Sequence, residues 1–209
     1  MIGRTISHII VQPEKSIIKK RKPIRLKEYD YSLEGSYFVT ICTKDHEDVL
    51  GQIVDSEIRL NQYGEIVQSC WNELPSHYSN ILLDEFVIMP NHVHGIIIII
   101  NDVVGAGLRP APTRDKRYPL SEIIRAFKSF SARRINEIRN TLGLSVWQRN
   151  YYDHIIRNER SLYKIREYIR TNPEQWTWDK ENRLFQGTDG FDRWLIDEVK
   201  QEITSQKIL

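Results

Sequence analysis

The chain has 209 residues, of which 40% are hydrophobic and 28% are charged, and its formal net charge is +2. This composition is typical of a soluble globular protein with one core. It excludes membrane-spanning classes, because the longest apolar run, residues 96 to 100, is far short of the roughly 20 residues that a transmembrane helix needs. No signal-peptide core stands near the N-terminus, so we expect a cytoplasmic protein with no membrane partner.

The two cysteines, Cys42 and Cys70, form no CxxC pair and no framework spacing. This usage suits a reducing compartment and argues against a thiolate metal site. We expect both to be small core residues.

Positive charge is concentrated in the stretch KKRKPIRLK, residues 19 to 27. Such a run attracts a polyanion by releasing counterions, and the alternative is a solvated arm that binds nothing. The residues assigned to DNA binding are Lys19, Lys20, Arg21, Lys22, Arg25 and, later in the chain, Arg149. We therefore divide the chain into a basic arm (1 to 28), a central domain (29 to 176) and a charged C-terminal tail (177 to 209).

In chain order, the first predicted element is a strand over residues 35 to 44, which is rich in β-branched and aromatic side chains. Residues 51 to 60 read as a small hairpin that turns near Asp55 and Ser56. From Asn61 the apolar residues recur at helical spacing until Pro75, where we expect the helix to stop.

Two strands are predicted next, over residues 82 to 89 and 92 to 100, with Pro90 and Asn91 as the break between them. Residues 101 to 119 have Gly, Pro and charge without periodicity and read as a loop. A helix follows over 120 to 139, with its arginines largely off the apolar face.

The last strand is predicted over residues 145 to 157, and Asn158 can cap a helix that ends at Asn172, because a residue before proline is pushed out of the helical region. Beyond Trp178 we expect a charged appendage with a short helix around 190 to 203.

Without the small hairpin, the order is strand, helix, strand, strand, helix, strand and a final helix. This order is that of the split βαβ, ferredoxin-like fold of the α+β class, with an antiparallel sheet. The first and third strands are then central and the helices cover one face. The five isoleucines at 96 to 100 belong to a central strand, where water reaches neither face.

His92 and His94 stand at the start of this isoleucine run. Residues two apart on a strand point to the same face, so both imidazoles can converge on one cation while Val93 packs away from it. The alternative is a pair of half-exposed surface histidines, and a metal site needs a third ligand.

The last helix of the domain offers a candidate for this third ligand. Lys164, Tyr168 and Asn172 are four residues apart in turn and form one stripe at the edge of the buried face. Tyr168 can present a phenol oxygen and Asn172 an amide oxygen, although a tyrosine in this position is often an ordinary packing residue.

Two stretches resemble a known family. MPNHVHGIII is similar to the histidine, apolar residue, histidine (HUH) signature of single-tyrosine transposases of the IS200-like superfamily. VWQRNYYDHIIRNERSLYKIREYIRTNP is similar to the C-terminal block of the REP-associated tyrosine transposases, and the likeness runs from about residue 25 to 176. It implies an HUH domain in which an extra C-terminal helix carries the nucleophile Tyr168, and His92, His94 and Asn172 bind the metal. Many relatives have glutamine where this chain has Asn172, so His154 is kept as the substitute third ligand.

The activity implied by this resemblance is cleavage and rejoining of single-stranded, hairpin-forming palindromic DNA through a 5′-phosphotyrosine. The cation would be Mg²⁺ or Mn²⁺, since amide and phosphate oxygens favour hard ions. The cation and Lys164 are candidates for favouring the phenolate, because a phenol has a pKa near 10. Trp147, Tyr151 and Tyr152 are candidates for stacking on bases.

The implied transposase would be a monomer or homodimer that is nucleoid-associated when bound to DNA. Three other functions stay open. One is an HUH replication initiator or relaxase-like nicking enzyme, and another is a non-catalytic protein that binds hairpin DNA. The third, a metal hydrolase of small substrates, would have no use for the basic arm.

Overall fold

The computed structural model describes residues 29–100 and 117–206. The basic arm and most of the predicted loop at 101 to 119 lie outside the described residues. Within the described part, no helix is both long and apolar enough to cross a membrane.

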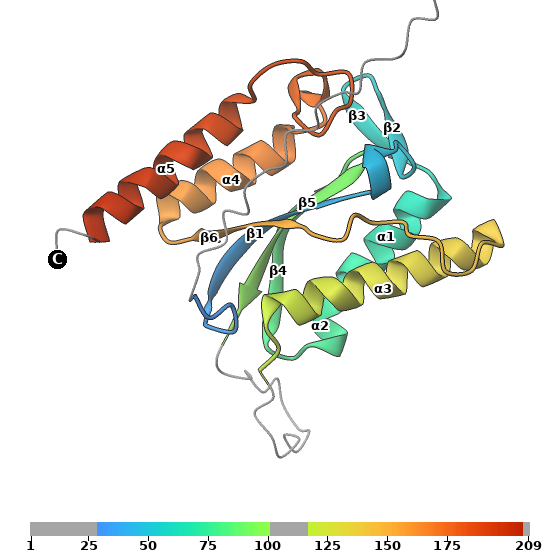
Figure 1. Cartoon of the computed structure of the whole chain (residues 1–209), viewed down its shortest axis with the longest axis horizontal. Helices are drawn as coiled ribbons and strands as arrows, with labels where there is room; N and C mark the ends of the chain where they lie inside the picture. Colours follow the sequence, from blue (N-terminus) through green and yellow to red (C-terminus); the bar gives the residue numbers. More distant parts are fainter. Residues whose placement is uncertain (1–28, 101–116, 207–209) are drawn as a thin grey trace, which may run out of the picture.

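A four-stranded antiparallel sheet forms the centre of the molecule, with the order β4-β5-β1-β6 (Figure 1). Its strands are β1 (Gly35–Cys42), β4 (Ile81–Ile88), β5 (His92–Ile99) and β6 (Tyr152–Ile156). The first and third strands of the split βαβ unit are β1 and β5, and both are central, as expected. The predicted α+β fold with an antiparallel sheet is confirmed.

The small hairpin is a separate two-stranded sheet of β2 (Gly51–Val54) and β3 (Glu57–Leu60). It turns at Asp55 and Ser56, as predicted, and both residues have positive φ values of 53° and 64°. Two successive residues in this region are the mark of a type I′ turn, whose twist matches that of paired strands.

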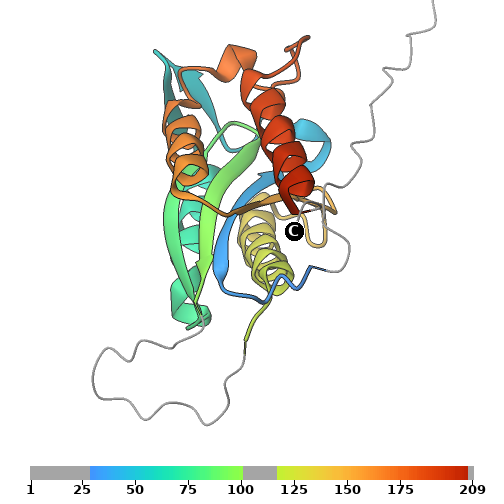
Figure 2. The same ribbon diagram turned by 90° about the vertical axis from the view of Figure 1, so that its left-hand side faces the viewer.

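The helices cover both faces of the sheet. On the first face lie α1 (Gln62–Asn72) and α3 (Leu120–Arg139), which are the two helices of the split βαβ unit, and on the second face lie α4 (Glu159–Thr171) and α5 (Gly190–Gln206) (Figures 1 and 2). The short elements are α2 (Leu74–His77), η1 (Lys44–His46) and η2 (Trp176–Trp178). The two helices of the split βαβ unit thus cover one face, as expected. The extra helix α4 lies on the opposite face of the sheet, with α5.

Two predicted boundaries are wrong. The first long helix ends at Asn72, before Pro75, which instead stands in the first turn of α2, where the missing N–H of proline costs nothing. The last strand begins at Tyr152, because residues 145 to 151 run alongside β1 with an isolated bridge between Trp147 and Thr43. The capped helix is confirmed: Asn158 Oδ1 accepts a hydrogen bond from Ser161 N at 2.8 Å.

Alternate residues of β5 enter two different cores. Val93, Ile97 and Ile99 face α1 and α3, whereas Ile96 packs under α4 and α5. Gly95 lies on the first face, where a Cβ atom would come within 2.4 Å of the Trp71 ring. The strand therefore accepts the large indole only because it has no side chain there.

The segment after Trp178 is packed against the sheet. Phe191 and Leu195 of α5 are buried in one cluster with Phe38, Ile96 and Ile169. The expectation of an appendage is therefore wrong, because α5 presents an apolar face that needs the sheet to cover it. The boundaries of arm, domain and tail stay predictions.

Candidate functional site

His92 and His94 lie side by side on the second face of the sheet, and neither side chain is exposed. Their ring centroids are 4.3 Å apart. The alternative of half-exposed surface histidines is wrong. Each Nδ1 atom has a partner: Asn91 Oδ1 lies 2.9 Å from His92 Nδ1, and Thr40 Oγ1 lies 2.9 Å from His94 Nδ1.

The neighbours of Asn91 determine which nitrogen of His92 carries the proton. Asn91 Nδ2 donates to the carbonyl oxygens of His46 and Glu181, so its Oδ1 must be the acceptor toward His92. Nδ1 of His92 then carries the proton and Nε2 keeps its lone pair. This Nε2 atom is buried with no hydrogen-bond partner in the described part of the chain, which is the state of an imidazole ready to bind a cation.

Helix α4 brings Tyr168 and Asn172 to the histidines. The Tyr168 hydroxyl lies 3.3 Å from His94 Nε2, and both side chains are buried. Since residues four apart on a helix share one face, Asn172 follows on the same stripe. The structure thus brings together the four residues that the sequence predicted.

A fifth residue, Asp179, completes the group and was not predicted. Its Oδ2 atom lies 3.9 Å from His92 Nε2 and 3.8 Å from His94 Nε2. The same oxygen accepts hydrogen bonds from Tyr168 OH at 3.2 Å and Asn172 Nδ2 at 2.7 Å. Asp179 directly follows η2, and an isolated acid after a helix carries no periodic signal, so only the return of the chain over the sheet reveals it.

Burial and charge set the protonation states of the group. Burial, followed by the nearby charge of His94, lowers the pKa of His92 to about 3. Burial alone would raise the pKa of Asp179, but the imidazoles of His92 and His94 and the hydrogen bond from Asn172 hold it well below its ordinary value. His92 is therefore neutral and Asp179 ionised at neutral pH, which are the forms that bind metals.

These side chains could hold a divalent cation. One ligand atom each of His92, His94 and Asp179 lies within 4.8 Å of the others, and Asn172 Oδ1 is buried beside them without a hydrogen-bond partner among the described residues. Two imidazole nitrogens with a carboxylate and an amide oxygen form a mixed donor set that accepts Mn²⁺, Mg²⁺ or Zn²⁺.

The surroundings of the Tyr168 phenol oppose its ionisation. Burial, and after it the charge of Asp179, raises the pKa of Tyr168 well above its ordinary value. The Tyr168 ring stacks on Phe191 of α5 with centroids 3.6 Å apart and planes inclined by 3°. A cavity of about 260 Å³ reaches this ring and is also lined by Asn172 and Asp179.

Three other candidates are not brought to the group. His154 is buried on β6 opposite Phe38, where its electrostatic neighbours are Arg157 and Glu198. Lys164 Nζ lies over the Trp194 ring at 4.6 Å, and Arg149 is exposed. The five basic residues of the arm lie outside the described residues.

The aromatic candidates for base stacking differ in burial. Trp147 is 5% exposed and its Nε1 donates to Ser131, so it belongs to the core. Tyr151 and Tyr152 are half-buried, and each has a lysine over its ring, Lys128 at 5.5 Å and Lys180 at 5.3 Å. Neither ring is an open stacking platform.

Two proteins of Haemophilus influenzae are similar to this chain in sequence. An uncharacterized protein of Haemophilus influenzae is 43% identical over 173 residues, covering 78% of this chain and 93% of that protein. A second H. influenzae protein, named "Putative REP-associated tyrosine transposase", is 24% identical over 145 residues and covers 69% of this chain and 73% of its own. No family model matches the chain.

Two solved structures are also similar. A REP-associated tyrosine transposase bound to a REP hairpin has a TM-score of 0.49 and 17% identity, over 75% of this chain and 76% of its own. A putative transposase from Deinococcus radiodurans has a TM-score of 0.41 and 18% identity, over 70% and 95%. The chain belongs to the same family as the uncharacterized Haemophilus protein. Its sequence similarity to the protein named a putative REP-associated tyrosine transposase agrees with the resemblance that its motifs indicated.

Proposed function

We propose that the protein is a metal-dependent transposase that cleaves and rejoins single-stranded hairpin DNA through Tyr168. The observation that supports this most is the Tyr168 hydroxyl, 3.3 Å from His94 Nε2 and 3.2 Å from Asp179 Oδ2. A tyrosine kept only for packing would not need its oxygen inside a cluster of metal-binding groups. Among the described residues, this phenol is the nucleophile candidate that adjoins such a cluster.

His92, His94 and Asp179 would hold the cation, with Asn172 as a further oxygen donor. When bound, the divalent ion supplies Lewis-acid stabilisation of the phosphodiester and favours the phenolate of Tyr168. That help is needed because burial and Asp179 both oppose ionisation of this phenol. Asp179 would thus have two roles: its Oδ2 atom accepts a hydrogen bond from Tyr168 OH, and its negative charge attracts the cation.

The reaction is a transesterification. The Tyr168 oxygen attacks phosphorus and loses its proton, a bond from Tyr168 to the 5′ phosphate forms, and the bond to the 3′ oxygen breaks. The 3′ oxygen leaves as a hydroxyl after taking up a proton. The phosphotyrosine keeps the free energy of the original ester, so a 3′-hydroxyl of another strand can displace Tyr168 without ATP.

The proposed substrate is a palindromic repeat in single-stranded form, as the resemblance to REP-associated tyrosine transposases implies; the 24% identical relative is named a putative member of that family. A flexible strand can enter the cavity beside Tyr168 more readily than a stacked duplex. We also propose that the protein binds this DNA as a monomer or homodimer, in the cytoplasm and on the nucleoid. A non-catalytic hairpin-binding protein is the second candidate, and the assembled His92, His94 and Tyr168 weigh against it.

Trapping the covalent adduct tests this proposal. Labelled single-stranded hairpin DNA is incubated with the full chain and Mn²⁺, and the denatured protein is examined for bound label. We expect an adduct in the wild type and in Tyr163→Phe, since Tyr163 lies on the same helix but is 64% exposed. Tyr168→Phe removes one oxygen atom and should form no adduct while it still binds the hairpin.

Two results would refute the assignment of Tyr168. One is an adduct in the Tyr168→Phe protein. The other is peptide mapping of the wild-type adduct to Tyr151, Tyr152 or Tyr163.

A further inference from the structure

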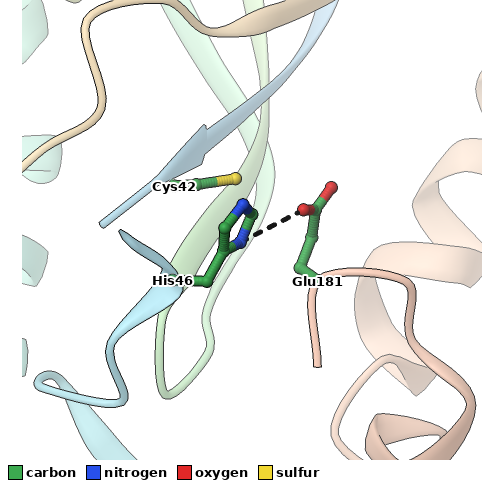
Figure 3. Close-up of side chains that lie close together, drawn as sticks. All are labelled: Cys42, His46 and Glu181. Carbon is green, nitrogen blue, oxygen red and sulfur yellow. Dashed lines mark ion pairs between the residues drawn. The ribbon is translucent and has the colours of Figure 1, made fainter. Parts of the chain in front are cut away.

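A second group of metal-binding side chains lies at the end of β1. Cys42 is the last residue of β1, His46 the last residue of η1, and Glu181 comes two residues after Asp179. Figure 3 shows the three side chains pointing toward one another. One ligand atom of each lies within 4.8 Å of the other two, and His46 Nδ1 is 3.5 Å from Glu181 Oε2.

Hydrogen bonds from one buried side chain hold two of these three residues in place. Asn91 Nδ2 donates to the carbonyl oxygen of His46 at 3.1 Å and to that of Glu181 at 2.8 Å. Cys42 is the direct cross-strand partner of His92, the residue next to Asn91. The group is therefore built on the same framework as the candidate active site, and it is not a chance contact of mobile surface chains.

Two of the three side chains, those of Cys42 and Glu181, are buried. Cys42 is 8% exposed and Cys70 is 4% exposed, so both cysteines are buried core residues, as the sequence suggested. The Glu181 side chain is 3% exposed, and burying a carboxylate costs several kcal/mol unless a positive charge compensates it. His46 is one of the groups near this carboxylate; it is 34% exposed and carries a charge only when protonated, whereas a bound cation would be a permanent positive charge.

The donor atoms favour a particular kind of ion. A thiolate, an imidazole and a carboxylate together suit Zn²⁺, and three protein ligands leave a fourth position for water. Zinc lies about 2.0–2.3 Å from such ligands, which requires ligand atoms roughly 3.5 Å apart. His46 and Glu181 already meet that spacing at 3.5 Å, and the ligand atom of Cys42 lies within 4.8 Å of both.

We propose that Cys42, His46 and Glu181 form a Zn²⁺ site, separate from the group of His92, His94 and Asp179. Because Glu181 stands two residues after Asp179, the ion would tie the segment that carries Asp179 to the ends of β1 and η1. The site supports the geometry of the proposed catalytic centre without touching its substrate. It does not depend on cleavage activity, since zinc binding here involves none of the catalytic side chains.

Cobalt binding tests the site directly. Co²⁺ bound to a thiolate shows a charge-transfer band in the near ultraviolet, and the group of His92, His94 and Asp179 contains no sulfur. We expect the reduced full chain, titrated with Co²⁺ alone, to develop this band at one ion per chain and to lose it when Zn²⁺ is added. Cys42→Ser should abolish the band, whereas Cys70→Ser, the matched control on α1, should keep it.

Two further variants separate this site from the active site. His46→Ala changes a half-exposed side chain, so it should fold, and it should raise at least tenfold the Co²⁺ concentration at which the thiolate band develops, a readout that the sulfur-free group does not give. His92→Ala should leave the Co²⁺ band unchanged even if it abolishes adduct formation. The proposal is overturned if the wild type shows no thiolate band, if Cys42→Ser keeps it, or if His46→Ala develops it at the same Co²⁺ concentration as the wild type.

Discussion

The two faces of the sheet are built from the same strands and differ in what they bury. Against α1 and α3, the strands present an apolar surface, which meets Trp71 of α1 and Phe127 of α3. Against α4 and α5, they present His92 and His94 along with apolar side chains. Successive residues of β5 therefore contribute to different faces, because side chains along a strand point alternately to opposite sides of the sheet.

This difference shows how a small domain can hold a polar site without losing its stability. Burying a polar group costs free energy unless it finds a partner, and each Nδ1 of the histidine pair has one. The first face is mainly apolar and supplies hydrophobic stabilisation. Changes on the first face should therefore reduce stability, and changes on the second should mainly reduce metal binding and chemistry.

The largest expected effect on stability is that of Trp71→Ala. Trp71 is fully buried, stacks on Phe86 and fills the space that Gly95 leaves. Its removal should lower the free energy of unfolding by about 3–5 kcal/mol. Urea denaturation measures the loss, and below its unfolding transition the variant should still form the DNA adduct. A loss under about 1 kcal/mol would show that the first face is not the main source of stability.

Asp179→Asn should have a smaller effect on stability and a larger one on the metal. Tyr168 and Asn172 both donate to the oxygen of Asp179, and weakening these bonds should cost about 1–3 kcal/mol. Mn²⁺ should raise the melting temperature of the wild type, since it binds only the folded state, and this shift should disappear in the variant. An undiminished shift would mean that Asp179 is not a ligand.

The ion pair between Asp84 and Arg166, which joins β4 to α4, should make a pH-dependent contribution. Arg166 donates to both carboxylate oxygens, at 3.0 Å and 2.5 Å, and these hydrogen bonds lower the pKa of Asp84. Stability from a lowered carboxylate pKa is fully present above the unfolded value of about 3.9 and is lost as the pH falls through the folded value.

Arg166→Gln should therefore cost about 1 kcal/mol at pH 7, a moderate value because Arg166 is 37% exposed, and progressively less in acid. Denaturation at a series of pH values measures this difference. Arg170→Gln is the matched control on the same helix. Arg170 forms a longer and more exposed ion pair: its Nε atom lies 3.8 Å from Glu85, and its side chain is 55% exposed. A cost for Arg166→Gln that does not change with pH would contradict the electrostatic explanation.

The smallest difference between the faces should be found at their helix caps. Asn61 Oδ1 caps α1 on the first face, and Asn158 Oδ1 caps α4 on the second. Each Asn→Ala change should cost about 1 kcal/mol, because a cap depends on its own helix end and not on the core below. Thermal denaturation of both variants checks this, and a much larger loss for one of them would show that its cap also positions tertiary contacts.

Local chemistry made much of this fold predictable. The helix over 120 to 139, the turn at Asp55 and Ser56 and the cap at Asn158 follow from residues that are neighbours in sequence. The order of elements then predicted the sheet topology, since few arrangements connect such a series. Periodicity also placed His92 with His94 and Tyr168 with Asn172, because each pair lies within one regular element.

Contacts between distant segments could not be predicted in this way. Asp179 reaches the histidines, and Glu181 reaches Cys42 and His46, only because the chain after η2 returns over the second face and α5 buries Phe191 there. By itself the sequence determined the strands, the helices and the two halves of the histidine and tyrosine site. Tertiary structure alone decided which carboxylates complete the two candidate metal sites, because packing, and not spacing along the chain, sets the distance between residues that belong to different elements.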